Sequence, residues 1–482
     1  MQSFFTASAA AGEGSSLTRM LSPQPTQLQA IDLAAPAEES GLTSARSALS
    51  KGFWSLADQG VVSVGNFATN ILLARSVARY DYGVFAILFG ILLFLNSIHA
   101  AFVSYPLSVK GATTDLAGLR RLTGHSLLLT GLLGLPLMAA SAVAAIVLGR
   151  GDLIVWLCGA MLFWQLQETI RRALMAHLRY RDAIWGDAIH FLGQSAVILL
   201  FAYWKELNLH VAFVAMCAAA AAGAAVQGLQ LGLRRVGRAQ WREFVRISWD
   251  LGRWMLLSSL VSVVSLQVVP WVLAYFYGVG EAGRLAAITT ILGVIHPVLF
   301  GIGSLIVPAA SRALLRGPRA AWRVGIKYTL LGAVLVTPYY LLVAAMPVLV
   351  LEVFYGVGSP YEDLTLALRM LVVCHAVDFL GTMLGGVLSG MGHSRWFFIA
   401  NLAGMIATAA IALPLTVWMG INGTLIGAIA AAAARLAWCV VYLRSAGCFK
   451  ADSDGNPVRL TACPSVLLYE GKTLEDKPPV TQ

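Results

Sequence analysis

RSVARYDYG, from Arg75 to Gly83, is the stretch that decides the fold, because the chain repeats its pattern in its second half. An apolar run ending in Leu-Leu-Ala precedes it, and a second run ending in Val-Leu-Ala precedes YFYGVGEAG at Tyr275–Gly283. Further along, RALMAHLRYRDAIWGD at Arg172–Asp187 matches GVLSGMGHSRWFFIAN at Gly386–Asn401. Because the matches follow the same order, the sequence predicts two related halves, an architecture found in membrane transporters.

The composition is typical of a membrane protein, since 58% of the residues are hydrophobic and only 12% are charged. A helix needs about 20 apolar residues to cross the hydrocarbon core. Such segments are expected at 53–74, 83–109, 122–148, 152–170, 183–204 and 210–233, and again at 252–277, 284–309, 326–350, 364–390, 396–417 and 421–443. We therefore predict an all-α polytopic membrane protein with about 12 transmembrane helices in two six-helix lobes.

The segments divide the chain into five predicted regions. An N-lobe at 51–233 and a C-lobe at 251–444 are joined by residues 234–250, where five arginines alternate with aromatic and aliphatic residues, as in an amphipathic helix at a membrane surface. Residues 1–50 form a polar tail that is expected to be disordered and that has no signal-peptide pattern. Residues 445–482 form a second polar tail.

Basic residues divide the connecting loops into two sets, and short cytoplasmic loops carry the excess of Lys and Arg. The basic set holds Arg120, Arg121, Arg171, Arg172, Arg179, Arg181, Arg234, Arg235, Arg238, Arg242, Arg246, Arg312, Arg316, Arg319, Arg323 and Lys327. The alternate loops hold few basic residues. Both termini are therefore predicted to be cytoplasmic, and this asymmetry explains most of the formal net charge of +10 without nucleic-acid binding.

Polar and ionisable residues inside apolar segments are the candidates for function, because they are costly in lipid and usually face a cavity or another helix. The candidates for substrate binding are Asn66, Asn70, His99, Gln267, His296 and Arg435. The candidates for coupling to an ion or a proton are Asp58, Asp187, His190, His375 and Asp378.

Each candidate also has a structural interpretation. Amide side chains between helices often only hold the helices together, and we favour this interpretation for the Asn and Gln candidates. Asp187 and His190, and likewise His375 and Asp378, lie one turn apart, which fits local pairing and a proton relay equally well. A guanidinium at membrane depth, as at Arg435, must pair with a carboxylate or meet an anionic substrate.

Signatures of catalysis and of cofactor binding are absent from the sequence. It contains no GxxxxGK[ST] nucleotide loop and no HExxH, and no predicted outer loop is long enough to form a folded domain. The six cysteines have no metal-ligand spacing, and no disulfide is expected. We therefore expect neither an enzyme, nor a cofactor, nor a bound metal.

Three stretches carry a family resemblance: Lys51–Ile87 with its polar first helix and LLAR motif, VLEVFYGVGSPYEDLTLALRML at Val350–Leu371, and LSGMGHSR at Leu388–Arg395. From about residue 50 to 445, the chain resembles the polysaccharide-transport, or O-antigen (lipopolysaccharide), flippases. These belong to the multidrug/oligosaccharidyl-lipid/polysaccharide (MOP) superfamily, together with the multidrug and toxin extrusion (MATE) antiporters. The resemblance implies a V-shaped fold of two lobes.

The resemblance also implies a function. Flippases of this family move polyprenyl-pyrophosphate-linked repeat units for exopolysaccharide, O-antigen or capsule from the inner to the outer leaflet of a bacterial inner membrane by alternating access. The implied partners are that lipid-linked oligosaccharide and the bilayer, with a polysaccharide polymerase and export complex as further candidates. Few Lys or Arg residues lie deep in the lobes, so Arg435 and histidines 99, 125, 296 and 375 would supply much of the positive charge.

Two other functions stay open. The first is a cation-coupled multidrug antiporter of the MATE type, for which Asp58, Asp187 or Asp378 could form the cation site. The second, less favoured, is a membrane polysaccharide polymerase, which would need a large folded outer loop.

Overall fold

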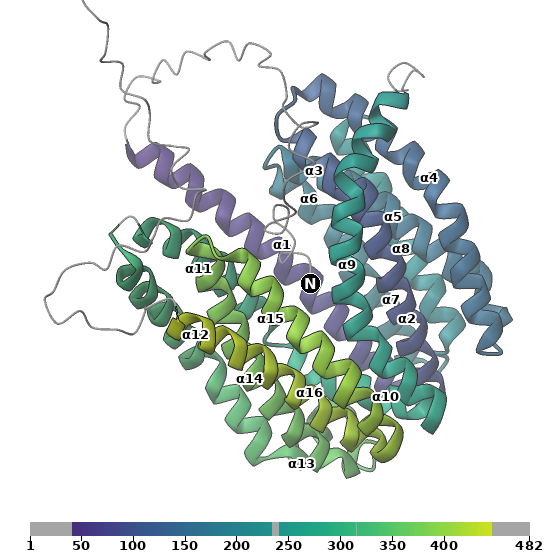
Figure 1. The fold of residues 1–482 in the computed structure, drawn as a ribbon. Helices are drawn as coiled ribbons and strands as arrows, with labels where there is room; N and C mark the ends of the chain where they lie inside the picture. Colours follow the sequence, from purple (N-terminus) through teal and green to yellow (C-terminus); the bar gives the residue numbers. More distant parts are fainter. Residues whose placement is uncertain (1–40, 234–240, 315, 446–482) are drawn as a thin grey trace, which may run out of the picture.

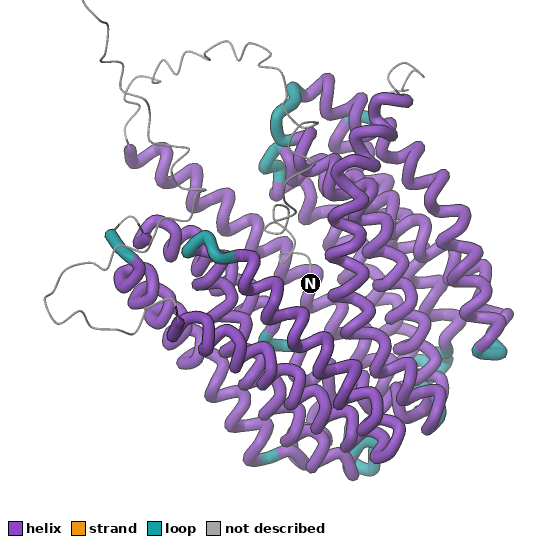
Figure 2. Tube along the Cα trace, in the orientation of Figure 1, coloured by secondary structure: helices purple, strands orange, loops and turns teal. Residues whose placement is uncertain are grey.

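The computed structural model describes residues 41–233, 241–314 and 316–445, and their regular structure is entirely helical (Figures 1 and 2). The first half contains α1 (Gly41–Ser76), α2 (Arg79–His99), η1 (Ala100–Ser104), α3 (Tyr105–Gly111), α4 (Leu116–Val147), η2 (Gly151–Leu153), α5 (Ile154–Ala176), α6 (Tyr180–Asp187), η3 (Ala188–Leu192), α7 (Gly193–Tyr203) and α8 (Leu209–Leu231). The second contains α9 (Trp241–Tyr277), α10 (Val279–Gly293), α11 (His296–Leu314), α12 (Pro318–Ala345), α13 (Pro347–Tyr355), η4 (Glu362–Leu364), α14 (Thr365–Gly390), α15 (Ser394–Ala407), η5 (Thr408–Ala412) and α16 (Leu413–Ser445).

The predicted fold class is confirmed: the chain is an all-α multi-pass membrane protein. Among the described residues, nine helical stretches are long and apolar enough to cross a membrane. One of them, Arg395–Arg444, contains two predicted segments, which separate at Gly420, where φ is 58°. The predicted segment 284–309 is divided between α10 and α11, because Pro297 cannot donate the hydrogen bond that would continue a helix across the junction. The segments at 53–74 and 252–277 lie within α1 and α9.

Two helix limits differ from the predicted region limits. Helix α1 begins at Gly41, so residues 41–50 are continuous with the helix that follows the predicted tail. Their Ala, Leu and Arg residues favour this extension, since these are good helix formers. The linker predicted at 234–250 is not a separate helix from Trp241 onward, because α9 runs without a break from Trp241 to Tyr277. Residues 1–40, 234–240 and 446–482 of the predicted tails and linker lie outside the described residues.

The two lobes join at one end of the molecule and diverge at the other (Figure 1). At the lower end of the view, one hydrophobic core contains residues from both lobes, including Leu73 and Leu88 from the N-lobe and Ile288 and Leu368 from the C-lobe. Toward the upper end, each lobe has a core of its own. The basic loops of the sequence lie at this diverging end.

A glycine pair lies where the lobes join. A Cβ atom added to Gly283 of α10 would lie 2.9 Å from Cα of Gly83 in α2, so the two backbones are in direct contact. The sequence repeat pairs these same two residues. Because equivalent positions of two repeats touch only near the axis that relates them, the Gly83–Gly283 contact marks the pseudo-symmetry axis between the lobes.

Charged side chains surround this contact and connect the lobes at the closed end. Arg79 of α2 forms an ion pair with Glu281 of α10. Glu281 also accepts a hydrogen bond of 3.0 Å from Arg284, which in turn pairs with Asp363. We call these four residues the closed-end latch, because the Arg79–Glu281 pair must break before this end can open.

Replacing Glu281 by Gln should open this end more often. The substitution removes the negative charge that holds Arg79 and Arg284, and partly exposed pairs contribute about 0.2–1 kcal/mol each. We expect the ratio of open to closed molecules to rise by about two- to fivefold. Spin labels at Lys205 and Val357, which lie in loops at this end in different lobes, would report a larger long-distance population by electron resonance. The exposed Glu206→Gln serves as control; equal populations in both variants would contradict the latch.

Candidate functional site

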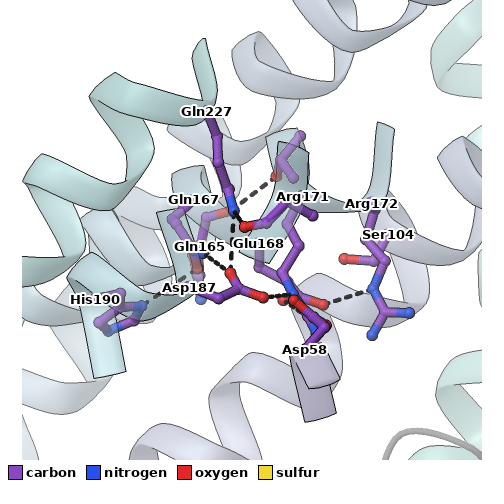
Figure 3. Close-up of polar contacts among 12 residues, drawn as sticks. Asp58, Ser104, Gln165, Gln167, Glu168, Arg171, Arg172, Asp187, His190 and Gln227 are labelled. Carbon is purple, nitrogen blue, oxygen red and sulfur yellow. Dashed lines mark hydrogen bonds and ion pairs between the residues drawn. The ribbon is translucent and has the colours of Figure 1, made fainter. Parts of the chain in front are cut away.

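A buried ion cluster occupies the N-lobe, with Arg171 at its centre (Figure 3). Arg171, in the last part of α5, donates a hydrogen bond of 2.6 Å to Asp58 of α1 and another to Asp187 at the end of α6. It also contacts Glu168 one turn earlier at 3.3 Å, and Glu168 accepts a bond of 2.6 Å from Arg172. The side chains of Asp58, Glu168, Arg171 and Asp187 are at most 4% exposed.

Neutral polar side chains extend this N-lobe ion cluster toward α8 and η3. Asp187 accepts hydrogen bonds from the amides of Gln167 at 2.5 Å and Gln227 at 3.0 Å. Gln167 also contacts the ring of His190 at 3.3 Å. His190 lies in the π-helical turn η3, which begins directly after Asp187. Such turns are rare and often occur at functional sites.

The N-lobe ion cluster carries more acids than bases. Written as fully ionised, it has three carboxylates, Asp58, Glu168 and Asp187, and two guanidinium groups, Arg171 and Arg172. Three carboxylates buried this close together repel one another, so a proton or a monovalent cation would stabilise the cluster. Asp58 Oδ1 and both polar atoms of Gln165 have no hydrogen-bond partner among the described residues, which places two unsatisfied acceptor oxygens and one unsatisfied donor nitrogen on α1 and α5.

A second polar cluster lies in the C-lobe, formed by α11, α14 and α16. Arg435 donates hydrogen bonds of 2.5 Å to the carboxylate of Asp378, 2.8 Å to its backbone carbonyl and 3.0 Å to Thr382. One turn before Asp378, the ring of His375 stacks on the ring of His296 with centroids 5.9 Å apart. We call His296, His375, Asp378, Thr382 and Arg435 the C-lobe polar cluster.

The two clusters differ in access. The carboxylates of the N-lobe ion cluster are buried, whereas the Asp378 side chain is 50% exposed and that of Arg435 is 17% exposed. An ionisable side chain inside a transmembrane helix usually faces other helices or a water-filled cavity, and this is the position expected for Asp378. The C-lobe polar cluster is therefore the more accessible of the two clusters.

The other predicted candidates have local roles in this structure. His99 is fully buried, and its Nε2 contacts Thr130 at 3.0 Å and Thr169 at 3.2 Å, as in a core histidine. Asn70 donates to the backbone carbonyl of Asn66 at 2.9 Å within α1. Gln267 of α9 packs against Gly90 of α2. The Gln267 contact joins two helices, whereas the Asn70 bond lies within one helix.

The structure changes the expected pairings. Asp187 binds Arg171, Gln167 and Gln227, and His190 reaches it through Gln167 instead of pairing with it directly. The role of Arg171 differs from the one predicted, since its position in the sequence placed it in a basic loop. A signal was present: two acids in apolar segments, Asp58 and Asp187, require a buried counterion.

Within residues 41–233, 241–314 and 316–445, no group of three or more His, Cys, Asp or Glu side chains is arranged to hold a metal ion.

No protein-family model and no curated protein matches the sequence. Solved structures match the fold. A multidrug resistance MATE family transporter of the MOP superfamily, in its inward-facing conformation, has a TM-score of 0.66 and 15% identity over 81% of this chain and 96% of that chain. The lipid II flippase MurJ, in an inward closed conformation, has a TM-score of 0.63 and 10% identity over 81% of this chain and 87% of that chain. An outward-facing MATE family transporter has a TM-score of 0.56 and 16% identity over 82% and 94%. The chain therefore has the fold of MOP superfamily transporters.

Proposed function

We propose that the protein is a flippase that moves polyprenyl-pyrophosphate-linked oligosaccharides from the cytoplasmic to the outer leaflet of a bacterial inner membrane. Its fold is shared with a lipid II flippase and with MATE transporters, and both kinds of protein move substrates across membranes. The arginine-rich loops at the diverging end support a cytoplasmic position for that end. In this orientation, the lobes are open to the side on which lipid-linked sugars are assembled.

The observation that carries the proposal is the exposure of the C-lobe polar cluster. Asp378 is half exposed at membrane depth, and the guanidinium of Arg435 lies beside it. A carrier of a polar headgroup needs such a polar surface between its lobes, while the polyprenyl chain stays in lipid. The pyrophosphate would replace the Asp378 carboxylate as the partner of Arg435, since guanidinium groups form strong paired hydrogen bonds with phosphate oxygens. His296 and His375 would supply further donors to the diphosphate or the sugar.

The N-lobe ion cluster supports a second part of the proposal, coupling to an ion. One of its clustered carboxylates would take up a proton or a monovalent cation during the cycle, with Asp58 and Asp187 as the acceptors and His190 connected through Gln167. The same observation favours the alternative function, a cation-coupled multidrug antiporter. The two functions differ in what the C-lobe polar cluster binds, an anion in the flippase and a cationic drug in the antiporter.

Deleting the gene in its host tests the proposed function. A flippase predicts that single lipid-linked repeat units accumulate and that surface polysaccharide is lost, because a polymerase on the outer side receives no substrate. Plasmid-borne protein must restore both. Normal lipid-linked intermediates with greater sensitivity to cationic drugs would contradict the flippase and favour the antiporter.

Arg435→Gln should fail to restore transport in this deletion strain. The substitution removes the charge that would bind the pyrophosphate but keeps hydrogen-bonding groups, and we expect at least about a tenfold loss, since charged hydrogen bonds contribute about 1.5–3 kcal/mol. Quantifying lipid-linked repeat units measures the effect. The control is Arg444→Gln, an exposed arginine at the end of the same helix, which should restore transport fully. Full activity of Arg435→Gln would remove the assignment of this residue.

A further inference from the structure

Five exposed basic side chains gather at the diverging end of the C-lobe, and neither cluster above involves them. They are Arg312 in the last turn of α11, Arg316 just after that helix, Arg323 and Lys327 in the first turns of α12, and Arg395 at the start of α15. We call these five residues the basic rim. Helix α11 continues into α12 through a tight turn at Gly317, and the helix ends lie together in Figure 1.

Packing between α14 and α11 holds the start of α15 close to the turn between α11 and α12. The hydroxyl of Ser311 in α11 donates a hydrogen bond of 2.7 Å to the carbonyl of Gly390 at the end of α14. A Cβ atom added to Gly390 would lie 2.7 Å from the side chain of Ala310, so the two helices touch there. The short turn from Gly390 to Ser394 then leads directly to Arg395. The rim is therefore one surface and not a set of separate loops.

No acidic residue compensates the basic rim within its own helices. The sequence contains no Asp or Glu from residue 296 to 351, nor from 379 to 450. Some bases elsewhere at this end have acidic partners: Arg179 pairs with Asp182 at 2.6 Å, Arg246 at the start of α9 pairs with Asp250 at 3.9 Å, and Arg171 and Arg172 bind the buried carboxylates. Membrane topology explains basic residues at this end, but it does not require that the helices carrying five of them contain no acids.

The surroundings of the rim are those of a membrane interface. A hydrophobic core that includes Ala313, Ala321 and Leu388 lies directly inside it. Trp396, next to Arg395, stacks on Tyr442 with ring centroids 4.4 Å apart, and tryptophan and tyrosine are enriched at the level of lipid headgroups. Arg323 and Lys327 lie one turn apart on α12, so their charges continue along the helix into the headgroup region, where long basic side chains extend toward phosphates.

We propose that the basic rim binds the phosphate groups of anionic phospholipids in the leaflet that it faces. Clustered basic side chains in helices without acids, interfacial aromatic rings and an apolar surface immediately below match a lipid headgroup above its acyl chains. The lipid would hold the end of the C-lobe at the membrane surface. This inference does not depend on the transported substrate.

The test compares lipid retention by the full-length protein and two triple variants. Arg312→Gln, Arg316→Gln and Arg323→Gln together reduce the rim, whereas Arg121→Gln, Arg242→Gln and Arg246→Gln remove the same charge from exposed positions of the first lobe and of the start of α9. Each purified protein is incubated with phosphatidylglycerol or phosphatidylcholine, and the bound lipids are counted by native mass spectrometry. Size-exclusion profiles confirm that all three proteins are folded.

We expect the wild type and the control variant to retain phosphatidylglycerol in preference to phosphatidylcholine. In the rim variant, the ratio of bound phosphatidylglycerol to bound phosphatidylcholine should fall at least about fivefold, because one basic residue at a membrane surface alone accounts for about this factor. Equal retention by both triple variants would overturn the proposal. So would equal binding of the two lipids by the wild type. Displacement of phosphatidylglycerol by a lower concentration of a polyprenyl diphosphate would show that the rim serves the substrate instead of the bilayer.

Discussion

Arg171→Ala is expected to prevent stable folding of the N-lobe. The substitution leaves Asp58, Glu168 and Asp187 buried together after the removal of the guanidinium that all three contact. Removing one partner of a buried ion pair costs about 3–5 kcal/mol, which is a large part of the net stability of a typical domain. The midpoint of thermal unfolding, followed by fluorescence-detected size exclusion, should fall sharply, and much of the protein should aggregate.

Arg172→Ala is the matched control, because Arg172 is the neighbouring residue, binds only Glu168 in the N-lobe ion cluster and is 23% exposed. It should lower the unfolding temperature less than Arg171→Ala does, because Glu168 keeps its contact with Arg171. Arg171→Gln combined with Asp58→Asn and Asp187→Asn should recover part of the loss, since the triple variant buries fewer unpaired charges. If Arg171→Ala unfolds at the same temperature as Arg172→Ala, Arg171 is not the counterion of the cluster.

Gly83→Val should abolish transport by preventing closure of the end at which the lobes join. Even a Cβ atom at position 83 would overlap the backbone carbonyl of Val279 in the opposite lobe. A backbone group cannot rotate away as a side chain can, so the helices must separate. Alternating access requires both ends to close in turn, so we expect loss of more than about tenfold in transport. Spin labels at Lys205 and Val357 should show a longer distance.

Gly131→Val is the control for this prediction, because nothing lies within 4 Å of a Cβ atom at that position of α4. It should transport normally. Gly283→Ala tests the same contact from the other side and should act in the same direction, since its Cβ atom would lie 2.9 Å from Gly83. Normal transport by both Gly83→Val and Gly283→Ala would show that the lobes do not rely on this close approach.

Local properties of the chain were sufficient to predict the helices and their approximate limits. Hydrophobic residues along a segment decide whether it lies in lipid, and a helix satisfies its own backbone hydrogen bonds there, so neither property requires knowledge of other segments. The repeat also identified Gly83 and Gly283 as equivalent positions. The extension of α1 to Gly41 and the continuity of α9 from Trp241 were missed, because polar composition near a membrane surface does not distinguish a tail or linker from the exposed turns of a long helix.

Which charged residues form ion pairs could not be predicted from the sequence, because the partners come from segments that are distant along the chain. Arg171 and Asp58 are 113 residues apart in the chain, and Arg435 and Asp378 are 57 apart, yet each pair is in hydrogen-bonding contact. The distribution of basic residues along the sequence places Arg171 in a loop, because the sequence does not show how deeply a side chain is buried or which side chains it contacts. Packing of α1, α5 and α6 removes it from solvent and surrounds it with carboxylates. The sequence thus determined the membrane architecture through local hydrophobicity, whereas helix packing determined which charges are neutralised in the N-lobe and which remain accessible in the C-lobe.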